Sequence, residues 1–224
     1  MPADQCPPAR PSGDRPGRAY LRQLLGERNQ YPERAAAIDA LVYAAFNRKV
    51  AILALDMCGF TREALAHGIV NFLAMIHQME QAAAPAVTGN GGQVIKQDAD
   101  NLFAIFAAPA HALEAALDIL RSFAAMNAVR PDESGIYASI GIGFGDTLVI
   151  ESHDLFGGEM NAACKLGEDL AGRMEILLTR DAFAALPADH YRCTEEHFPV
   201  AGIDLQCYRY DATLLPRPSP AAVR

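Results

Sequence analysis

Two aspartates stand where apolar strands end, and a carboxylate at such a place can bind a metal ion. Asp56 ends the apolar run VAILAL at 50–55, which is typical of a strand buried on both faces. Asp100 lies in the turn of a predicted hairpin, between two apolar strands. Carboxylates that lie close together raise each other's pKa, and a divalent cation removes their repulsion. Turns also favour aspartate for its local hydrogen bonds, so either residue alone indicates little.

A predicted phosphate-binding turn next to Asp56 makes a metal site more plausible than an ordinary turn aspartate. The turn Gly59-Phe60-Thr61 opens a helix predicted to run from 62 to about 84, with Thr61 as its N-cap. The free N–H groups and the positive dipole end of a helix N-terminus bind anions. A metal site and a phosphate site would then adjoin, which is the arrangement that a nucleoside triphosphate requires.

The elements that position these residues alternate between strand and helix from Lys49 onward. The first strand is followed by the helix at 62–84. The apolar face of this helix is expected to carry Leu65, Ile69, Phe72, Ile76 and Met79. We then expect a hairpin of 94–97 and 102–106, a helix at 109–127, a second hairpin of 136–143 and 147–150, a helix at 157–172, a strand at 175–179, a short helix at 180–186, and strands near 191–195 and 205–210.

This order predicts an α+β fold with a ferredoxin-like βαββαβ core, an extra hairpin and C-terminal strands. In such a core the first strand lies beside the first hairpin, which brings Asp56 and Asp100 close together. The chain is expected to divide into a proline-rich disordered tail at 1–18, an N-terminal helical segment at 19–48, a main domain at 49–212 and a second disordered tail at 213–224.

Composition excludes several classes of partner. The 19 Lys and Arg against 27 Asp and Glu leave a net charge of −8, which disfavours nucleic acid and anionic membrane, because both need a broad basic patch. The five cysteines show no metal-ligand spacing, and no apolar run is long enough to cross a membrane. Without a secretory signal, the chain is expected to be cytoplasmic.

Four segments, taken in order, resemble the catalytic domain of the class III adenylate/guanylate (nucleotidyl) cyclases. They are LALDMCGFT at 53–61, GGQVIKQDADNLFAIF at 91–106, SIGIGFGDTLVI at 139–150 and DLFGGEMNAACKLGEDLAGRM at 154–174. The resemblance implies that Asp56, Asp100 and the carbonyl of Met57 hold two Mg²⁺ or Mn²⁺ ions. One ion would activate the ribose 3′-hydroxyl and the other would hold the triphosphate.

The resemblance also implies roles for the residues that contact the nucleotide. Phe60 and Thr61 would contact the phosphates through backbone N–H groups, and Asn161 would position the ribose. Lys96 and Asp154 match the pair that recognises the base, and together they complement adenine. The implied activity is that of a lyase in signal transduction, an adenylate cyclase that converts ATP to 3′,5′-cyclic AMP and pyrophosphate.

Three departures from the family pattern bear on activity. Lys165 stands where the family usually has an arginine that stabilises the transition state, so the charge is kept and the bidentate fork is lost. Ala99 replaces the glycine that commonly precedes the second metal aspartate. The segment 200–205 lacks the lysine that contacts the terminal phosphates in many members, and no lysine follows Lys165.

Two further functions stay open beside an active adenylate cyclase. One is a catalytically weak nucleotide-binding or signalling protein of cyclase fold, and the other is a cyclase for GTP or a pyrimidine nucleotide. In the family the sites form between two domains, so a chain with one such domain implies a homodimer with two equivalent sites. The aspartate pair of one protomer would face the base-recognising and transition-state residues of its partner.

Overall fold

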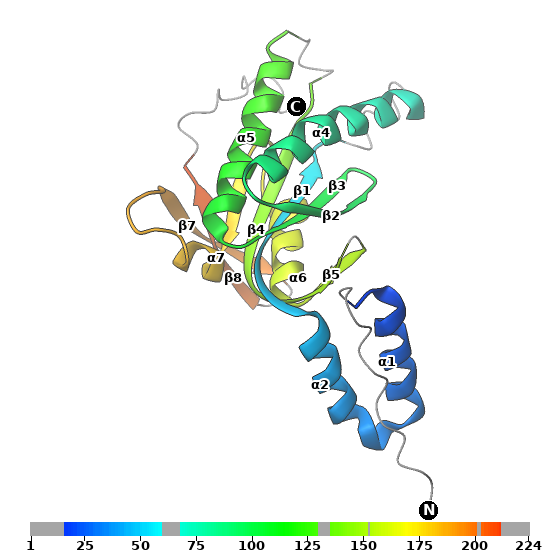
Figure 1. Cartoon of the computed structure of the whole chain (residues 1–224). Helices are drawn as coiled ribbons and strands as arrows, with labels where there is room; N and C mark the ends of the chain where they lie inside the picture. Colours follow the sequence, from blue (N-terminus) through cyan, green and yellow to red (C-terminus); the bar gives the residue numbers. More distant parts are fainter. Residues whose placement is uncertain (1–15, 60–67, 130–134, 152, 201–202, 212–224) are drawn as a thin grey trace, which may run out of the picture.

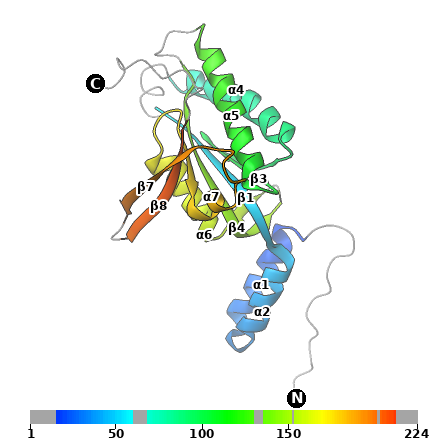
Figure 2. The ribbon, with the colours of Figure 1, turned by 90° about the vertical axis from the view of Figure 1, so that its left-hand side faces the viewer.

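A computed structural model describes residues 16–59, 68–129, 135–151, 153–200 and 203–211. Its described part contains an eight-stranded sheet in the order β2-β3-β1-β4-β6-β8-β7, with β5 paired to β4. Helices α4 and α5 cover one face of this sheet and α6 lies against the other, while α1 and α2 project from one end (Figures 1 and 2). In the described ranges, no helix combines the length and the apolar character that crossing a membrane demands.

The centre of the sheet is the predicted βαββαβ core. Strand β1 (Asn47–Met57) pairs antiparallel with β3 (Asn101–Phe106) on one side and with β4 (Ala138–Ile150) on the other. Strand β2 (Gln93–Asp98) forms a hairpin with β3. The helices α4 (Ile69–Gly89) and α5 (Pro109–Asn127) complete the unit, and the predicted bounds of α5 match. The ferredoxin-like core is therefore confirmed.

The apolar run of β1 is buried on both sides because each side meets a different layer. Ala51, Leu53 and Leu55 belong to the core beneath α4 and α5, whereas Ile52 and Ala54 belong to the cluster that contacts α6. All five side chains are 0–1% exposed. A strand buried on both faces has no polar alternation, and this explains the continuous apolar pattern in the sequence.

The predicted second hairpin is wrong. Residues 138–150 form one continuous strand of 13 residues, paired with β1 from Asn47↔Leu148 to Met57↔Ala138. Gly145, between the two strands predicted for that hairpin, instead leaves room for the Glu159 side chain on the sheet face. The hairpin partner of β4 is the short strand β5 (Asp154–Phe156).

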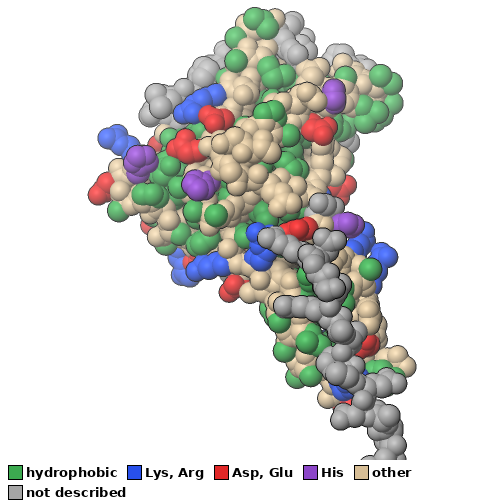
Figure 3. Space-filling view, viewed as in Figure 1, with side chains coloured by type: hydrophobic (Ala, Val, Ile, Leu, Met, Phe, Trp, Pro, Cys, Tyr) green, Lys and Arg blue, Asp and Glu red, His purple; other side chains and the backbone are tan. Residues whose placement is uncertain are grey.

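Helix α4 also differs from its prediction. It continues past Pro85 to Gly89, because Ala83 and Val87 at its end are fully buried in the core. The buried stripe includes Phe72, Met75 and Met79, whereas Ile69 is 60% exposed, so the predicted apolar face was shifted. Hydrophobic side chains are visible over α4 in Figure 3. The predicted helix start at 62 and the Thr61 cap lie outside the described residues.

The remaining elements close the sheet and attach the N-terminal helices. The predicted helix at 157–172 is α6 (Gly158–Cys164), which continues as a π-helical segment, η3 (Lys165–Leu170). Then follow β6 (Ile176–Thr179), α7 (Arg180–Ala184), β7 (Cys193–Val200) and β8 (Ile203–Tyr210). At the other end, α1 (Arg18–Gln30), η1 (Pro32–Arg34) and α2 (Ala35–Phe46) pack around Leu24, Ile38, Val42 and Phe46, and α2 leads directly into β1.

Glycines let α6 and η3 lie directly on the central strands. A Cβ atom added to Gly141 would lie 2.0 Å from the carbonyl oxygen of Ala163 and 2.6 Å from the nitrogen of Gly167. A Cβ atom on Gly167 would lie 2.7 Å from the carbonyl oxygen of Ala54. On the same face, Glu159 Oε2 accepts hydrogen bonds from Phe144 N (3.0 Å) and from Thr179 Oγ1 (2.8 Å).

We expect Gly141→Ala to lower the free energy of unfolding by about 3 kcal/mol, because the atoms that it meets are backbone and cannot rotate away. Thermal melting of the metal-free protein measures the change. Gly158→Ala is the matched control, since a Cβ atom there meets nothing within 4 Å. Equal melting temperatures for Gly141→Ala and the wild type would show that α6 can shift without cost.

Candidate functional site

The two predicted metal ligands lie at neighbouring points of the sheet. Asp56 is the penultimate residue of β1, and Asp100 lies in the turn between β2 and β3. The turn is tied to β1 by a hydrogen bond from Met57 N to the carbonyl oxygen of Asp100 (3.2 Å). Ala99 in this turn has φ 51°, a left-handed conformation that glycine adopts more easily. The structure therefore brings the two aspartates together, as the fold predicted.

The electrostatic setting of this pair disfavours negative charge. Burial raises the pKa of Asp56 to about 7, and the charges of Asp100, Glu168 and Asp169 add to the shift. Burial also raises the pKa of Asp100, and the charge of Asp98 adds to it. A divalent cation reverses this situation, because its charge favours both ionised carboxylates.

The donor set fits a hard cation that brings other ligands with it. In the parts of the chain that the structure describes, no group of three or more His, Cys, Asp or Glu side chains could enclose a metal ion. Two carboxylates with a backbone carbonyl leave positions for phosphate oxygens and water, which is how Mg²⁺ is commonly held. The residues present therefore fit a metal ion that completes its coordination with phosphate oxygens and water.

In the metal-free protein, Asp56→Asn is expected to raise the melting temperature at pH 8. Because the folded-state pKa of Asp56 is raised from 3.8 to about 7, the folded protein binds the extra proton, and stability falls as pH rises through that interval. Each kcal/mol recovered corresponds to about 2–4 °C. Calorimetry at pH 5 and pH 8 measures the effect, which should shrink at pH 5, where Asp56 is protonated. A lower melting temperature for Asp56→Asn at pH 8 would contradict the electrostatic account.

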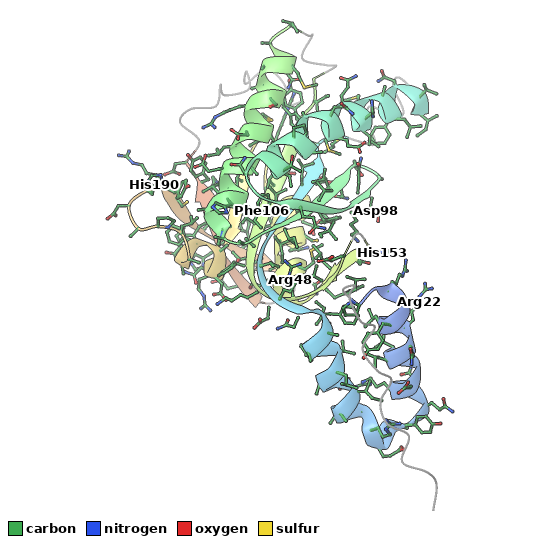
Figure 4. All side chains as sticks on the ribbon, in the orientation of Figure 1. Arg22, Arg48, Asp98, Phe106, His153 and His190 are labelled. Atoms are coloured by element: carbon green, nitrogen blue, oxygen red, sulfur yellow. The ribbon has the colours of Figure 1, made fainter. Side chains whose placement is uncertain are left out.

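Lys96 and Asp154, predicted to recognise the base, form an ion pair. Lys96 Nζ on β2 lies 2.8 Å from Asp154 Oδ1 on β5, and it also lies 5.0 Å from the centre of the Phe103 ring. The same carboxylate oxygen accepts a hydrogen bond from Leu155 N (2.9 Å). Figure 4 shows Asp98 at the end of β2 and His153 just before β5 on the same side of the molecule. A donor and an acceptor are thus presented side by side.

Asn161 and Lys165 lie on α6 and η3, the helical segments that pack directly against glycines of the sheet. Asn161 is exposed on α6, and Lys165 follows it by one turn at the start of η3. Lys165 Nζ pairs with Asp169 Oδ2 at 2.6 Å, and both side chains are partly exposed. Cys164 lies between Asn161 and Lys165 in the sequence. Burial raises the pKa of its thiol to about 11, so the thiol is protonated at neutral pH.

Glu168 and Asp169 are acidic residues near the site that the sequence analysis missed. Burial raises the pKa of Glu168, the charges of Asp169 and Asp100 add to the shift, and the charge of Lys96 opposes it. Glu168 therefore interacts electrostatically with Asp100 of the aspartate pair and with Lys96 of the pair predicted to recognise the base. In the sequence these residues have the spacing of an ordinary helix ion pair with Lys165, and only the packing of η3 against β1 places them near Asp56.

Some predicted contacts lie beyond the described residues. Phe60 and Thr61, expected at the phosphates, are outside them, and so are 201–202 in the segment that lacks the phosphate-contacting lysine. Met57 is described: its side chain is buried in the core, and its backbone N–H donates to the carbonyl oxygen of Asp100.

Comparisons with known proteins identify the fold. An adenylate/guanylate cyclase/hydrolase from Silicibacter pomeroyi aligns over 73% of this chain and 96% of its own, with 25% identity and a TM-score of 0.62. The adenylyl cyclase CyaB from P. aeruginosa aligns over 76% and 98%, with 16% identity and a TM-score of 0.61. The chain has the class III nucleotidyl cyclase fold.

Other comparisons bear on the extent of the likeness to cyclases. No protein-family model matches the chain. A putative adenylate cyclase 3 from Rhizobium meliloti (strain 1021) is 28% identical over 119 residues, which is 53% of this chain, and the chain spans only about a fifth (20%) of that relative's length. A guanylate cyclase domain from Catenaria anguillulae in complex with GTP shares the cyclase fold at 16% identity, covering 72% of this chain and 95% of its own, with a TM-score of 0.62. The fold is therefore common to cyclases of both purine nucleotides.

Proposed function

We propose that the chain is a nucleotidyl cyclase that converts ATP to 3′,5′-cyclic AMP and pyrophosphate. The observation that carries the proposal is the adjacent pair Asp56 and Asp100, at the end of β1 and in the β2–β3 turn of a cyclase fold. The raised pKa values of both carboxyls favour the binding of a cation there. A protein that only binds nucleotide has little need of both carboxylates.

Asp56, Asp100 and the carbonyl of Met57 would hold two Mg²⁺ or Mn²⁺ ions. When bound, the ions would lower the pKa of the ribose 3′-hydroxyl and would place positive charge at the triphosphate. The protein's own contribution is to fix both carboxylates on the rigid ends of β1 and the β2–β3 hairpin. Phe60 and Thr61 are proposed to bind the phosphates through their backbone N–H groups.

Lys96 and Asp154 are proposed to select adenine. The ammonium of Lys96 donates to adenine N1, and the carboxylate of Asp154 accepts from the N6 amine. Guanine presents an acceptor where adenine presents this amine, so the same pair would leave groups unsatisfied. The 2.8 Å separation of Lys96 and Asp154 supports a joint role, because both groups must meet one edge of one base.

Asn161 and Lys165 are proposed to act on the ribose and the reacting phosphate. Asn161 positions the sugar, and Lys165 stabilises the charge that develops on the α-phosphate. The Lys165–Asp169 ion pair is partly exposed, so it contributes at most about 1 kcal/mol and can be exchanged for phosphate oxygens.

We further propose that the chain forms a homodimer whose two sites are shared between protomers. The start of α4 offers an apolar surface for such an interface, because Ile69, Val70 and Leu73 are 60%, 77% and 56% exposed. A twofold dimer would use this surface on both protomers.

A catalytically weak nucleotide-binding protein is the second candidate. The observation that favours it is Lys165, which lacks the planar fork of arginine. Because a guanylate cyclase domain in complex with GTP shares the fold, GTP is the alternative substrate proposed for this chain.

Incubation with each of ATP, GTP, CTP and UTP in the presence of Mn²⁺, with cyclic products identified by mass, tests the proposed function. We expect ATP to be the best substrate, with GTP slower by about 10-fold or more, because a mismatched hydrogen-bonding edge costs about 1–3 kcal/mol. A preference for UTP or CTP would contradict the roles given to Lys96 and Asp154. Nucleotide binding without any cyclic product would favour the second candidate.

A further inference from the structure

A neutral amide lies directly across the sheet from the first metal aspartate. Asn101, the first residue of β3, is the register partner of Asp56 on β1. Residues that lie opposite each other in an antiparallel pair project their side chains from the same face. The two side chains are therefore neighbours by construction of the sheet, independently of any ligand.

The hydrogen bonds of Asn101 determine which way its amide faces. With the amide nitrogen toward β1, Asn101 donates to Asp56 Oδ1 (3.1 Å) and to the carbonyl oxygen of Leu55 (3.2 Å). In the opposite orientation the amide oxygen would face these same two oxygens, which cannot donate to it. The donating orientation is the one that satisfies both partners.

These contacts restrain the carboxylate without neutralising it. One amide hydrogen binds Oδ1, and the other binds the backbone carbonyl of Leu55 on the same strand, so the amide links one carboxylate oxygen to the backbone of β1. Within the residues that the structure describes, Oδ2 accepts no hydrogen bond and can bind another ligand. A lysine or arginine at this position would also hold Oδ1, but its positive charge would repel a metal ion.

We propose that Asn101 is a positioning residue for the metal site, which orients the Asp56 carboxylate for a divalent cation. The proposal rests on the metal-binding role of Asp56 in the proposed function, but it does not depend on which nucleotide is the substrate. Hydrogen-bond partners of this kind change metal affinity by about 10- to 100-fold when they are removed.

The test compares Mn²⁺ binding by the full chain and by Asn101→Leu, which keeps the approximate side-chain size and lacks the donor. Electron paramagnetic resonance measures free and bound Mn²⁺ in the presence of 3′-deoxy-ATP, which lacks the attacking hydroxyl. We expect the dissociation constant for Mn²⁺ to rise about 10-fold or more. In the activity assay, the Mn²⁺ concentration for half-maximal rate should rise similarly, with kcat largely restored at saturating Mn²⁺.

Gln93→Leu is the matched control, because Gln93 lies on the same hairpin at its opposite end and is exposed. Its Mn²⁺ affinity should equal that of the wild type. Asn101→Ala, which introduces no bulk, repeats the test if the leucine variant does not fold.

Unchanged Mn²⁺ affinity in a folded Asn101 variant would overturn the proposal, as would loss of folding in both variants, since Asn101 would then serve the hairpin alone. Absence of Mn²⁺ binding by the wild type would overturn it as well. If the wild type binds Mn²⁺ but forms no cyclic product, the proposed cyclase activity fails, and the comparison of affinities still decides the role of Asn101.

Discussion

Asp100→Asn is expected to reduce the rate of cyclic AMP formation by about 10²-fold or more at saturating ATP and Mn²⁺. Asparagine keeps the shape of the side chain and loses the charge that holds the cation, so the transition state loses several kcal/mol of stabilisation. The rate is measured by mass identification of the product. Circular dichroism and melting check that the fold is retained.

Asp98→Asn provides the matched control for this prediction. Asp98 belongs to the same hairpin and is exposed, and the same substitution there removes a neighbouring charge without removing a proposed ligand. Its rate should stay close to that of the wild type. Near-wild-type turnover by a folded Asp100→Asn variant would remove the two-metal mechanism.

Mixing two inactive variants is expected to restore about a quarter of the wild-type activity. Suppose that Asp56→Asn and Asn161→Ala homodimers are combined in equal amounts and allowed to exchange subunits. If each site takes its aspartates from one protomer and its asparagine from the other, a heterodimer has one doubly damaged site and one intact site. Random exchange makes about half of the dimers heterodimers, each with one good site of two.

A second mixture tests whether the recovery has this origin. Asp56→Asn and Asp100→Asn alter the same side of the site, so in a shared geometry their heterodimers have two damaged sites and should show no recovery. Subunit exchange is verified with differently tagged chains. Lack of recovery in the first mixture, despite verified exchange, would place each site within a single protomer.

Local sequence pattern was enough for the core of the fold and the proximity of the aspartates. The uninterrupted apolar run of β1 is typical of a strand buried on both faces. The order of strands and helices then favoured the ferredoxin-like pairing of β1 with the β2–β3 hairpin, which the structure has. Once that pairing exists, Asp56 and Asp100 meet at one end of it. The resemblance to cyclases added the Lys96 and Asp154 pair, which spacing along the chain does not reveal.

Tertiary packing decided the features that local pattern misrepresented. Gly145 is a residue type that turns favour, but β4 is continuous through it. Two other glycines of β4, Gly141 and Gly143, let the backbone of α6 contact the strand directly, and this contact involves residues about 20 positions further along the chain. The same contact carries Glu168 and Asp169 to the aspartate pair. Asn101 is an unremarkable hairpin residue until the strand register sets it opposite Asp56. In each case the sequence specifies the residue type, whereas its partner is set only when separate elements pack together.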